Sequence, residues 1–580
     1  MDVIGVTSIM PFLAVLAEPS MIGSNRLISL FYQLGRFSSV NHFLFALGVS
    51  AFLVLIVSAI IRSLALYSQN NFTGMRRHSL SCRLLEGYLS QPYEYFLIHH
   101  SSEMERNILS EVDQFIERAL TPLTVLLSSA FVLVAMSIVL IAIDPISALI
   151  VALVLGTAYA TIFVTIRPYL TKLGSERVRA NQGRYESAAE ALGGIKFLKL
   201  VGQERHYLDK FVFYSNMFSN NISVSNVLAQ APKFMIETIA FGGILLLALI
   251  LMLRHGGTST SALSTVLPLL GLYTLAGYRM LPAVQNIYHS MTQLRFAGPA
   301  IDALQTELTA SAACIDLPVS SPTRLKYSDT LAFNNVTYHY PNSDNAGIKN
   351  ITFSVKRGSH LGIVGATGAG KTTLVDVLLG LLSPSSGTIS VDGNPITADT
   401  VRRWQATLGY VPQDIFLTDN TVAENIAFGI HANNINMKRV EDCARAAQID
   451  AFIENELTLG YFTPVGERGV RLSGGQRQRI GIARALYRDP DIIVFDEATS
   501  ALDTTTEKDV MHAIAELSGS KTVITITHRL STVQTCDNLL ILNNGQGVGF
   551  GPYSHLLASN EHLKRLHASG SVHPPLSMNK

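Results

Sequence analysis

The stretch Gly365-Ala-Thr-Gly-Ala-Gly-Lys371-Thr372 decides the fold of the second half of this 580-residue chain. It matches the pattern G-x-x-x-x-G-K-[ST] and stands between the apolar run 361–364 and a helical pattern of leucines and valines. Strand, glycine-rich loop and helix in this order predict a phosphate-binding loop, because backbone N–H groups and the helix N-terminus then face the phosphates. We expect Lys371 to reach the β- and γ-phosphates of a nucleotide and Thr372 to offer its hydroxyl to Mg²⁺. A glycine-rich turn without a ligand is the alternative, and the order of the elements disfavours it.

A second group of residues extends this prediction to catalysis. The run Leu472-Ser-Gly-Gly-Gln476 is followed by a short basic helical pattern and then by Ile492-Ile-Val-Phe-Asp496-Glu497. Four apolar residues that end in an acid predict a buried parallel strand, which delivers Asp496 to its carboxyl end to hold Mg²⁺ opposite Thr372. Glu497 then falls at the edge of the loop, in the place of a general base for water.

At these residues the chain resembles the ATP-binding cassette family, whose signature LSGGQ is present letter for letter at 472–476. The resemblance covers nearly the whole chain. It implies a membrane α-helical bundle of the exporter type with six spans, followed by an α/β P-loop ATP-binding cassette domain. It also implies ATP and Mg²⁺ as cofactors and ATP hydrolysis coupled to transport, with Glu497 positioning a water for in-line attack on the γ-phosphate.

The resemblance assigns further residues. It implies that Tyr340 stacks on adenine, that Gln413 links the γ-phosphate and Mg²⁺ to the membrane domain, and that His528 is the switch histidine. Ser500-Ala-Leu-Asp503 looks like the D-loop, and Glu467-Arg-Gly469 resembles a loop typical of exporters. Taken singly, Tyr340 could instead be a strand aromatic, Gln413 a turn residue and His528 a core histidine. The implied nucleotide-binding residues are Tyr340, Gly365, Gly368, Gly370, Lys371, Thr372, Thr373, Ser473, Gly475, Gln476 and Asp503, the implied catalytic residues are Glu497, His528 and Gln413, and the implied Mg²⁺ ligands are Thr372, Gln413 and Asp496.

The signature serine, Ser473, has no obvious partner in its own domain, because in this family LSGGQ closes over the nucleotide held by the opposite subunit. One cassette per chain therefore implies a dimer. A homodimer is expected, and a heterodimer stays open.

The composition places the first half of the chain in a membrane. The chain is 48% hydrophobic and 15% charged, with a mean hydropathy of +0.29, which is too apolar for an ordinary soluble protein. Residues 123–143 and 146–166 carry no charge, and each segment is near the length of about 20 residues that crosses a hydrocarbon layer. Residues 43–66, 234–253 and 262–282 are predicted spans that contain one or a few ionisable residues. Buried helices of a soluble protein are the alternative.

Charge and cysteine usage exclude other classes of protein. The net charge of +1 and the lack of a basic and aromatic patch give no support for nucleic acid as a partner. The four cysteines are scattered without the spacing of metal ligands, which favours reduced thiols over a disulfide framework or a zinc site.

Lysine and arginine predict the orientation in the membrane. Residues 67–121 contain five of them and residues 167–233 contain ten, whereas the opposite loops contain only Arg26, Arg36 and Arg254. The long loops and the cassette are therefore predicted to be cytoplasmic.

The long cytoplasmic loops have helical, charge-mixed patterns that look like the extensions of exporter helices. Short coupling segments are expected near 91–100 and 202–211. A solvated, charged helix face would give the same sequence pattern and is the alternative. The predicted domains are a membrane domain with helical extensions at 1–308, a linker at 309–330, the cassette at 331–568 and a disordered tail at 569–580.

The first predicted span, residues 3–17, is short. About 15 apolar residues extend roughly 22 Å as a helix, against a hydrocarbon thickness of about 30 Å. The basic amphipathic helix that usually precedes this span in the family is also missing, so we expect an upstream extension in the natural protein. A signal peptide is the alternative, because Ala14-Val-Leu-Ala17 resembles a cleavage site, but Asp2 stands where a basic region is expected.

Four segments of the membrane half, residues 9–16, 196–200, 231–234 and 278–282, resemble the lipid-linked oligosaccharide flippase of bacterial N-glycosylation. This resemblance implies translocation of a polyprenyl-diphosphate glycan or a related amphipathic lipid, and it implies a bacterial inner membrane as the location of the protein. Export of drugs, peptides or other lipids stays open, as does a non-transport ATPase, which the uncharged spans disfavour.

Three cations are candidates for binding a diphosphate at the entrance of an inward-open cavity. Arg62 and Arg279 lie about 19 and 17 residues from the outer ends of their spans, hence at similar depths. Lys233 begins the fifth span from the cytoplasmic side, near the same level. In the alternative interpretation each side chain reaches to the interface, and Glu237, one turn away, neutralises Lys233.

Overall fold

The computed structural model of the protein describes residues 26–35, 39–143, 145–254, 260–312, 323–341, 345–466, 469–497, 521–527, 533–561 and 563–564, together with residues 12, 15, 16, 22 and 37. Most side chains between residues 239 and 279 lie outside that description. The chain divides into two compact units. One unit comprises Met1–Gln91 and Ile98–Leu317, and the other comprises Pro92–Leu97 and Pro318–Lys580.

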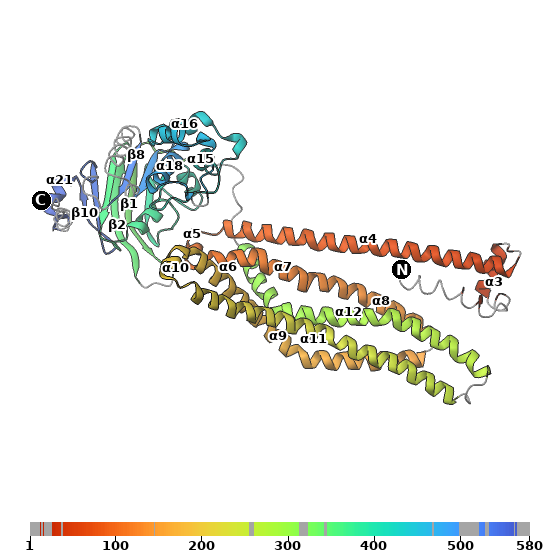
Figure 1. Ribbon diagram of the computed structural model, residues 1–580. Helices are drawn as coiled ribbons and strands as arrows, with labels where there is room; N and C mark the ends of the chain where they lie inside the picture. The colour runs from red at the N-terminus through yellow and green to blue at the C-terminus, as the bar shows by residue number, and fades with distance from the viewer. Residues whose placement is uncertain are drawn as a thin grey trace. The chain divides into compact units, whose positions relative to one another are not determined.

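Long helices build the first unit (Figure 1). In this unit α8 and α9 each pack against α12, and α11 packs against both α9 and α12. Two π-helical turns, Arg106–Glu111 and Ile116–Leu120, lie in the continuous helical stretch that leads into α8. The helices are α3 (Arg26–Leu34), α4 (Val40–Leu89), α6 (Ser101–Glu105), α7 (Val112–Phe115), α8 (Thr121–Ile143), α9 (Pro145–Gly193), α10 (Ile195–Val201), α11 (Glu204–Arg254) and α12 (Thr260–Ala312).

Five of the predicted spans lie inside these helices, in α4, α8, α9, α11 and α12. Among the described residues, Val40–Leu89 and Ser101–Ile138 are long and apolar enough to cross a membrane by length and composition. The 50 residues of α4 extend about 75 Å, far more than a hydrocarbon layer of about 30 Å, so much of this helix projects beyond it. The predicted span at 3–17 lies outside the described residues, apart from residues 12, 15 and 16.

Two short helices lie between the long ones, and one of them falls where a coupling segment was expected. The first, α5 (Tyr93–Ile98), matches the segment near 91–100, and its residues as far as Leu97 belong to the second unit. The second short helix is α10, and the predicted segment 202–211 was misplaced. Gly202 adopts a left-handed φ of 69° and ends α10, so the residues from Glu204 onward already belong to the long helix α11.

A buried ion pair ties the first π-helical turn to α9. Arg177 Nη1 lies 3.0 Å from Glu111 Oε2, and the two side chains are 1% and 3% exposed. Asn181 Nδ2 donates to the other oxygen of the same carboxylate at 2.9 Å. Charges this deeply buried are tolerated only when paired, so the network fixes the register between the two helices.

Two sheets form the frame of the second unit (Figure 1). The six-stranded sheet has the order β10-β9-β3-β8-β7-β6, in which β10 is an antiparallel edge and the other pairs are parallel. The smaller sheet is antiparallel, with the order β2-β1-β4-β5. The strands are β1 (Thr330–His339), β2 (Ala346–Lys356), β3 (His360–Gly365), β4 (Ser386–Val391), β5 (Asn394–Pro395), β6 (Leu408–Val411), β7 (Ile492–Asp496), β8 (Thr522–Ile526), β9 (Asn538–Asn543) and β10 (Gln546–Gly551).

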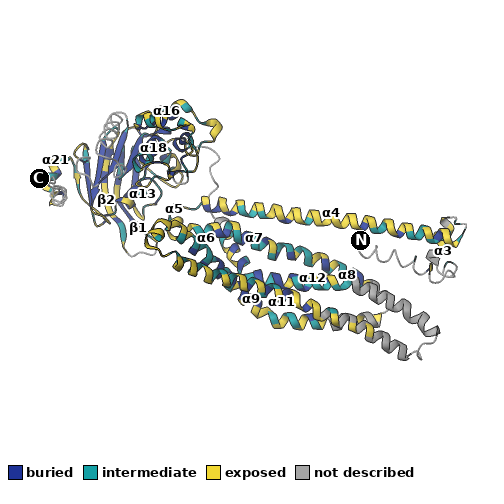
Figure 2. Cartoon of the chain, in the orientation of Figure 1, coloured by how far each residue is buried: buried dark blue, intermediate teal, exposed yellow. Residues whose placement is uncertain are grey.

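The central strands are buried along their whole length. Every residue of β3, β7 and β8 is buried, as expected for parallel strands covered on both faces (Figure 2). Two hydrophobic clusters lie on the sheet, one around α13 and the smaller sheet and one around α15, α16 and α18. The helices are α13 (Lys371–Leu378), α14 (Val401–Gln405), α15 (Val422–Ile426), α16 (Met437–Ala446), α17 (Asp450–Glu456), α18 (Gly474–Tyr487) and α21 (Tyr553–Ser559).

Candidate nucleotide site

The sheet register brings the phosphate-binding loop and the two acidic residues to one edge. Ile526 of β8 pairs with Ile363 of β3 on one side and with Asp496 of β7 on the other. Parallel strands end on the same side, so the loop after β3 and the carboxyl end of β7 are neighbours. The predicted strands at 361–364 and 492–496 are therefore confirmed as β3 and β7.

The loop 366–370 requires glycine at two positions. Gly368 and Gly370 have φ angles of 78° and 96°, in the left-handed region that side chains disfavour. A Cβ on Gly370 would lie 2.7 Å from the carbonyl oxygen of Gly347, whereas a Cβ on Gly368 would meet nothing within 4 Å. Gly370 then stands at the N-cap of α13, where the free N–H groups of the helix begin.

Lys371 is held inside this loop. Its Nζ donates to the carbonyl oxygens of Gly365 and Ala366 at 2.9 and 3.1 Å, and the residue is 8% exposed. Burial lowers the pKa of the ammonium group, and the carboxylates of Glu497 and Asp496 oppose this shift. A phosphate entering the loop would exchange two neutral carbonyl partners for charged oxygens, which make stronger hydrogen bonds.

Asp496 and Glu497 follow each other at the end of β7 but have different surroundings. Asp496 is 9% exposed, and its pKa is raised by burial and by the adjacent Glu497. The hydroxyl of Tyr410 on β6 donates to Asp496 Oδ2 at 3.3 Å. Glu497 has a left-handed φ of 50°, its N–H donates to Ile526 O at 3.0 Å, and Gln413 Nε2 donates to its Oε2 at 3.0 Å.

Asp376 is a carboxylate of this site that the sequence reasoning missed. It lies on α13, where burial and the charge of Asp496 raise its pKa to about 6. An acid within the apolar run of the helix, Leu374-Val-Asp376-Val-Leu378, was the available signal. Together Asp376, Asp496 and Glu497 give the site more negative than positive charge before a ligand enters.

The excess of negative charge at this site suits a divalent cation, and the carboxylate oxygens are the hard ligands that Mg²⁺ prefers. Among the described residues, no group of three or more His, Cys, Asp or Glu side chains could hold a metal by itself. In nucleotide sites Mg²⁺ generally keeps several waters and is held by one or two protein ligands together with the phosphate oxygens.

Tyr340 packs beside the start of α13. Its hydroxyl hydrogen-bonds the Thr373 hydroxyl at 2.8 Å, and its ring meets Tyr338 edge-on with centroids 5.1 Å apart. Tyr338 is buried and donates to Glu94 Oε1 of α5 at 3.1 Å. Sequence reasoning missed the pair of Tyr338 and Glu94, which joins α5 to β1, the strand that ends just before the proposed adenine-stacking residue Tyr340.

The signature motif forms the N-terminus of α18. Ser473 is the N-cap: its Oγ accepts from Gln476 N at 3.2 Å, and its N–H donates to Gln476 Oε1 at 2.7 Å. This capping box leaves the N–H groups of Gly474 and Gly475 at the helix start, where the helix dipole favours an anion. Asp503 and His528 lie outside the described residues, as do the first two residues, Glu467 and Arg468, of the predicted exporter loop 467–469.

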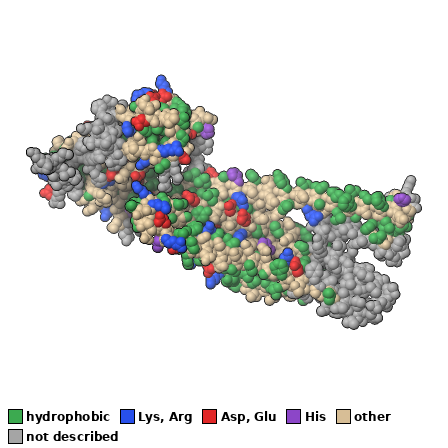
Figure 3. Space-filling view, in the orientation of Figure 1, with side chains coloured by type: hydrophobic (Ala, Val, Ile, Leu, Met, Phe, Trp, Pro, Cys, Tyr) green, Lys and Arg blue, Asp and Glu red, His purple; other side chains and the backbone are tan. Residues whose placement is uncertain are grey.

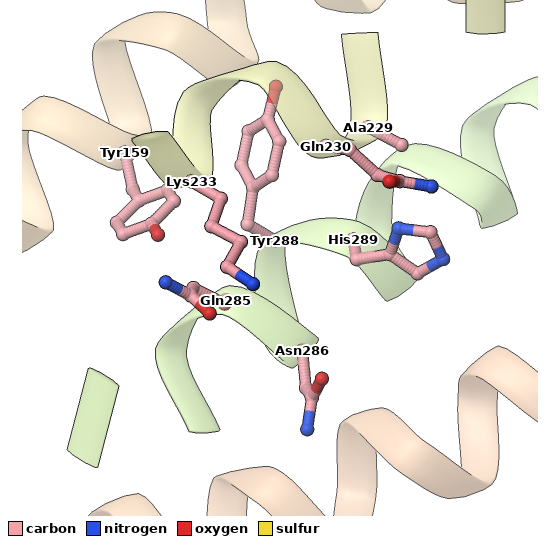
Figure 4. A pocket seen from close by; sticks show the side chains of 8 residues that line it. All are labelled: Tyr159, Ala229, Gln230, Lys233, Gln285, Asn286, Tyr288 and His289. Atoms are coloured by element: carbon pink, nitrogen blue, oxygen red, sulfur yellow. The ribbon is translucent and has the colours of Figure 1, made fainter. Parts of the chain in front are cut away.

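Three basic residues were predicted to bind the substrate, and among the described side chains one of them lines a pocket. Lys233 lines a pocket of about 290 Å³ between α9, α11 and α12 (Figure 4). Its Nζ lies 3.9 Å from Glu237 Oε1, which is the neutralisation that the alternative interpretation expected. Arg62 is exposed on α4, with Nε donating to Ser58 O at 3.4 Å, and it does not line the pocket. The side chain of Arg279 is outside the description.

These features define the protein as a P-loop ATPase that is joined in one chain to a bundle of long apolar helices. Two family models match the chain: the ABC transporter model over residues 348–500 and the ABC transporter transmembrane region model over residues 7–274.

Relatives and a solved structure extend the match over most of the chain. The ATP-dependent lipid A-core flippase of Alkalilimnicola ehrlichii is 30% identical over 490 residues, which is 83% of this chain and 80% of that protein. The flippase of the same name from Cupriavidus metallidurans is 28% identical over 530 residues, 89% of this chain and 86% of that protein. A bacterial Atm1-family ABC exporter with ATP bound shares the fold, with a TM-score of 0.79, 23% identity and 98% of each chain covered.

The chain therefore belongs to the ABC transporter family. It is an integral membrane half-transporter of the exporter fold, with fused membrane and ATP-binding domains, and its ATP hydrolysis is coupled to transport.

Proposed function

We propose that the chain flips a lipid-linked oligosaccharide or a related glycolipid across a bacterial inner membrane, with its cassette in the cytoplasm. The observation that carries this proposal is a polar pocket, lined by Lys233, Tyr159 and Gln285, inside a unit whose helices expose apolar side chains. Apolar side chains gather along α4 (Figure 3), where Phe45 is 75% exposed and Leu64 60% exposed. A substrate with a polar head and an apolar tail fits such a unit, and relatives named lipid A-core flippases support lipid as cargo.

We propose that Glu497 orients the attacking water. Its hydrogen bond from Gln413 fixes the direction of the carboxylate, and Lys371 stabilises the charge that builds on the γ-phosphate. Mg²⁺, when bound, would neutralise phosphate oxygens, with Asp496, Thr372 and Gln413 as its proposed protein ligands.

We also propose that the transporter is a homodimer. Ser473 and the first N–H groups of α18 would complete a nucleotide site on the second copy. The short helix α10 supports a partner, because Phe197 is 73% exposed and Leu200 is 82% exposed. Apolar side chains presented this fully on a segment outside the predicted spans mark an interaction surface.

Transport in proteoliposomes tests the proposed function. The purified chain should move a fluorescent polyprenyl-diphosphate glycan in the presence of ATP, and Glu497→Gln, reconstituted to the same density, should not. A panel of drugs, peptides and other lipids tests the alternative, an exporter of one of these classes. Movement of a panel member without movement of the glycan lipid would replace the proposal by that alternative.

A further inference from the structure

The pocket between α9, α11 and α12 contains an open hydrogen-bonding position. Tyr159 is 7% exposed, and its hydroxyl has no hydrogen-bond partner among the described residues. The neighbouring Tyr288 differs, because its hydroxyl donates to Leu228 O at 3.1 Å. In Figure 4 the Tyr159 hydroxyl lies on the side of Gln285 and of the end of Lys233, whereas the Tyr288 hydroxyl points away from them. A buried hydroxyl without a partner is unfavourable, so a ligand that pairs with it is favoured.

Neutral polar groups make up most of the remaining polar lining. The amides of Gln230, Gln285 and Asn286 and the imidazole of His289 face the same space. Burial lowers the pKa of His289, so its ring is neutral near pH 7; a hydrogen bond to the backbone of Ala229 engages the ring donor, and the other ring nitrogen is an acceptor. The amides also present donors and acceptors together, which suits a ligand whose own groups do both.

The charges in the pocket are balanced. Lys233 is the one lysine or arginine among the described lining residues, and Glu237 lies 3.9 Å from its ammonium group. Gln285 Nε2 donates to the same Glu237 oxygen at 3.2 Å, which holds the carboxylate beside the pocket. A diphosphate carries two or more negative charges and needs surplus positive charge when it leaves water, which these side chains do not provide.

The size and the wall of the pocket point to a small ring. A volume of 290 Å³ is close to the lower end of the roughly 300–1,000 Å³ of small-molecule sites. The rings of Tyr159 and Tyr288, with centroids 5.3 Å apart, form an apolar wall on one side. A sugar ring combines apolar C–H faces with hydroxyls that donate and accept, and so matches both the wall and the amides.

We propose that this pocket binds one neutral sugar residue of the transported glycolipid, with the Tyr159 hydroxyl and the amides of Gln230 and Gln285 as its hydrogen-bond partners. The inference rests on the proposed function and refines it, because it assigns recognition here to the saccharide and not to the diphosphate. Lys233 directly precedes the predicted span 234–253, so a bound sugar would sit where a lipid tail can enter the membrane.

Binding of two lipids to the full-length, detergent-solubilised protein tests the inference. One lipid is a polyprenyl diphosphate that carries a single neutral sugar, and the other is the bare polyprenyl diphosphate. The wild type should bind the sugar-bearing lipid more tightly. Tyr159→Phe keeps the ring and removes the hydroxyl, so it should weaken binding of the sugar-bearing lipid about three- to tenfold and leave the bare lipid unchanged.

Tyr288→Phe is the matched control, because its hydroxyl points away from the pocket, and it should retain the preference for sugar. Equal binding of the two lipids by the wild type, or an equal loss for both in Tyr159→Phe, would overturn the inference. A strong weakening of the sugar preference by added salt would also count against it, since a neutral ligand releases few counterions. A free monosaccharide that binds as tightly as the glycolipid would show a site for soluble sugar and would overturn the assignment to the lipid. Selective binding without ATP-driven flipping would refute the proposed function and leave the sugar site standing.

Discussion

Replacing Glu497 by glutamine separates its chemical role from its structural one. The substitution keeps the volume of the side chain and an oxygen that can accept from Gln413 Nε2, which now lies 3.0 Å from the carboxylate. It removes the negative charge and the ability to take a proton from water. We expect ATP binding to be retained, because Lys371 and the loop of α13 are untouched.

The size of the effect distinguishes the two roles. A positioned general base contributes about 10²- to 10⁴-fold in rate, which raises the barrier by roughly 2.7–5.5 kcal/mol. The hydrogen bond between Gln413 and Glu497 is exposed to solvent, and its weakening would cost about 1 kcal/mol, or less than tenfold in rate. A drop of two or more decades therefore measures the loss of the base and not the loss of the hydrogen bond.

Steady-state phosphate release and binding of a fluorescent ATP analogue, measured on the same preparations, provide the assay. Lys371→Ala is the matched control, and it should weaken nucleotide binding itself. Turnover of Glu497→Gln within a factor of ten of the wild type would refute the assignment of Glu497 as the base.

Three further predictions concern single contacts. Gly370→Ala should abolish binding of an ATP analogue, because its Cβ would stand 2.7 Å from a carbonyl oxygen. The Cβ of Gly368→Ala would meet nothing within 4 Å, so this variant should lose about tenfold or less in affinity for the analogue. Equal losses of affinity in the two variants would contradict the steric argument. Glu94→Ala should lower the stability of the protein by about 1–3 kcal/mol, because it leaves the buried hydroxyl of Tyr338 unpaired, and Tyr338→Phe should cost less, as the shift in apparent unfolding temperature will show. Burial lowers the pKa of His360 below 6.5, so as the pH drops below about 6.5 the unfolded chain binds a proton that the folded chain does not, and the free energy of unfolding decreases. His360→Gln should reduce this decrease by up to about 1.4 kcal/mol for each pH unit. If the free energies of unfolding of the two proteins depend on pH in the same way between pH 7 and 5, this role of His360 is excluded.

The nucleotide site was predictable from the sequence because its parts are local. A run of apolar residues before Gly365 and another before Asp496 are enough to predict two buried parallel strands, and parallel strands end at the same edge of a sheet. The contact of Tyr338 with Glu94 had no such signal, because 244 positions separate the two residues and neither belongs to a motif. Asp376 was not predicted as a residue of the site for a related reason. Its pKa depends on Asp496, which only the folded sheet brings near α13.

By itself the sequence determined the phosphate-binding loop, the strand that ends at Asp496, the helical spans and their order, since each follows from the pattern of neighbouring residues. The tertiary structure decided which polar side chains of the membrane unit meet. Helices that are apolar on all sides have no face that fixes their rotation, so depth along a span placed Arg62, Lys233 and Arg279 at one level without showing which of them share a space. Packing of α9, α11 and α12 joins Lys233 to Tyr159, Gln285 and His289, because side chains on three helices meet only where the helices pack together.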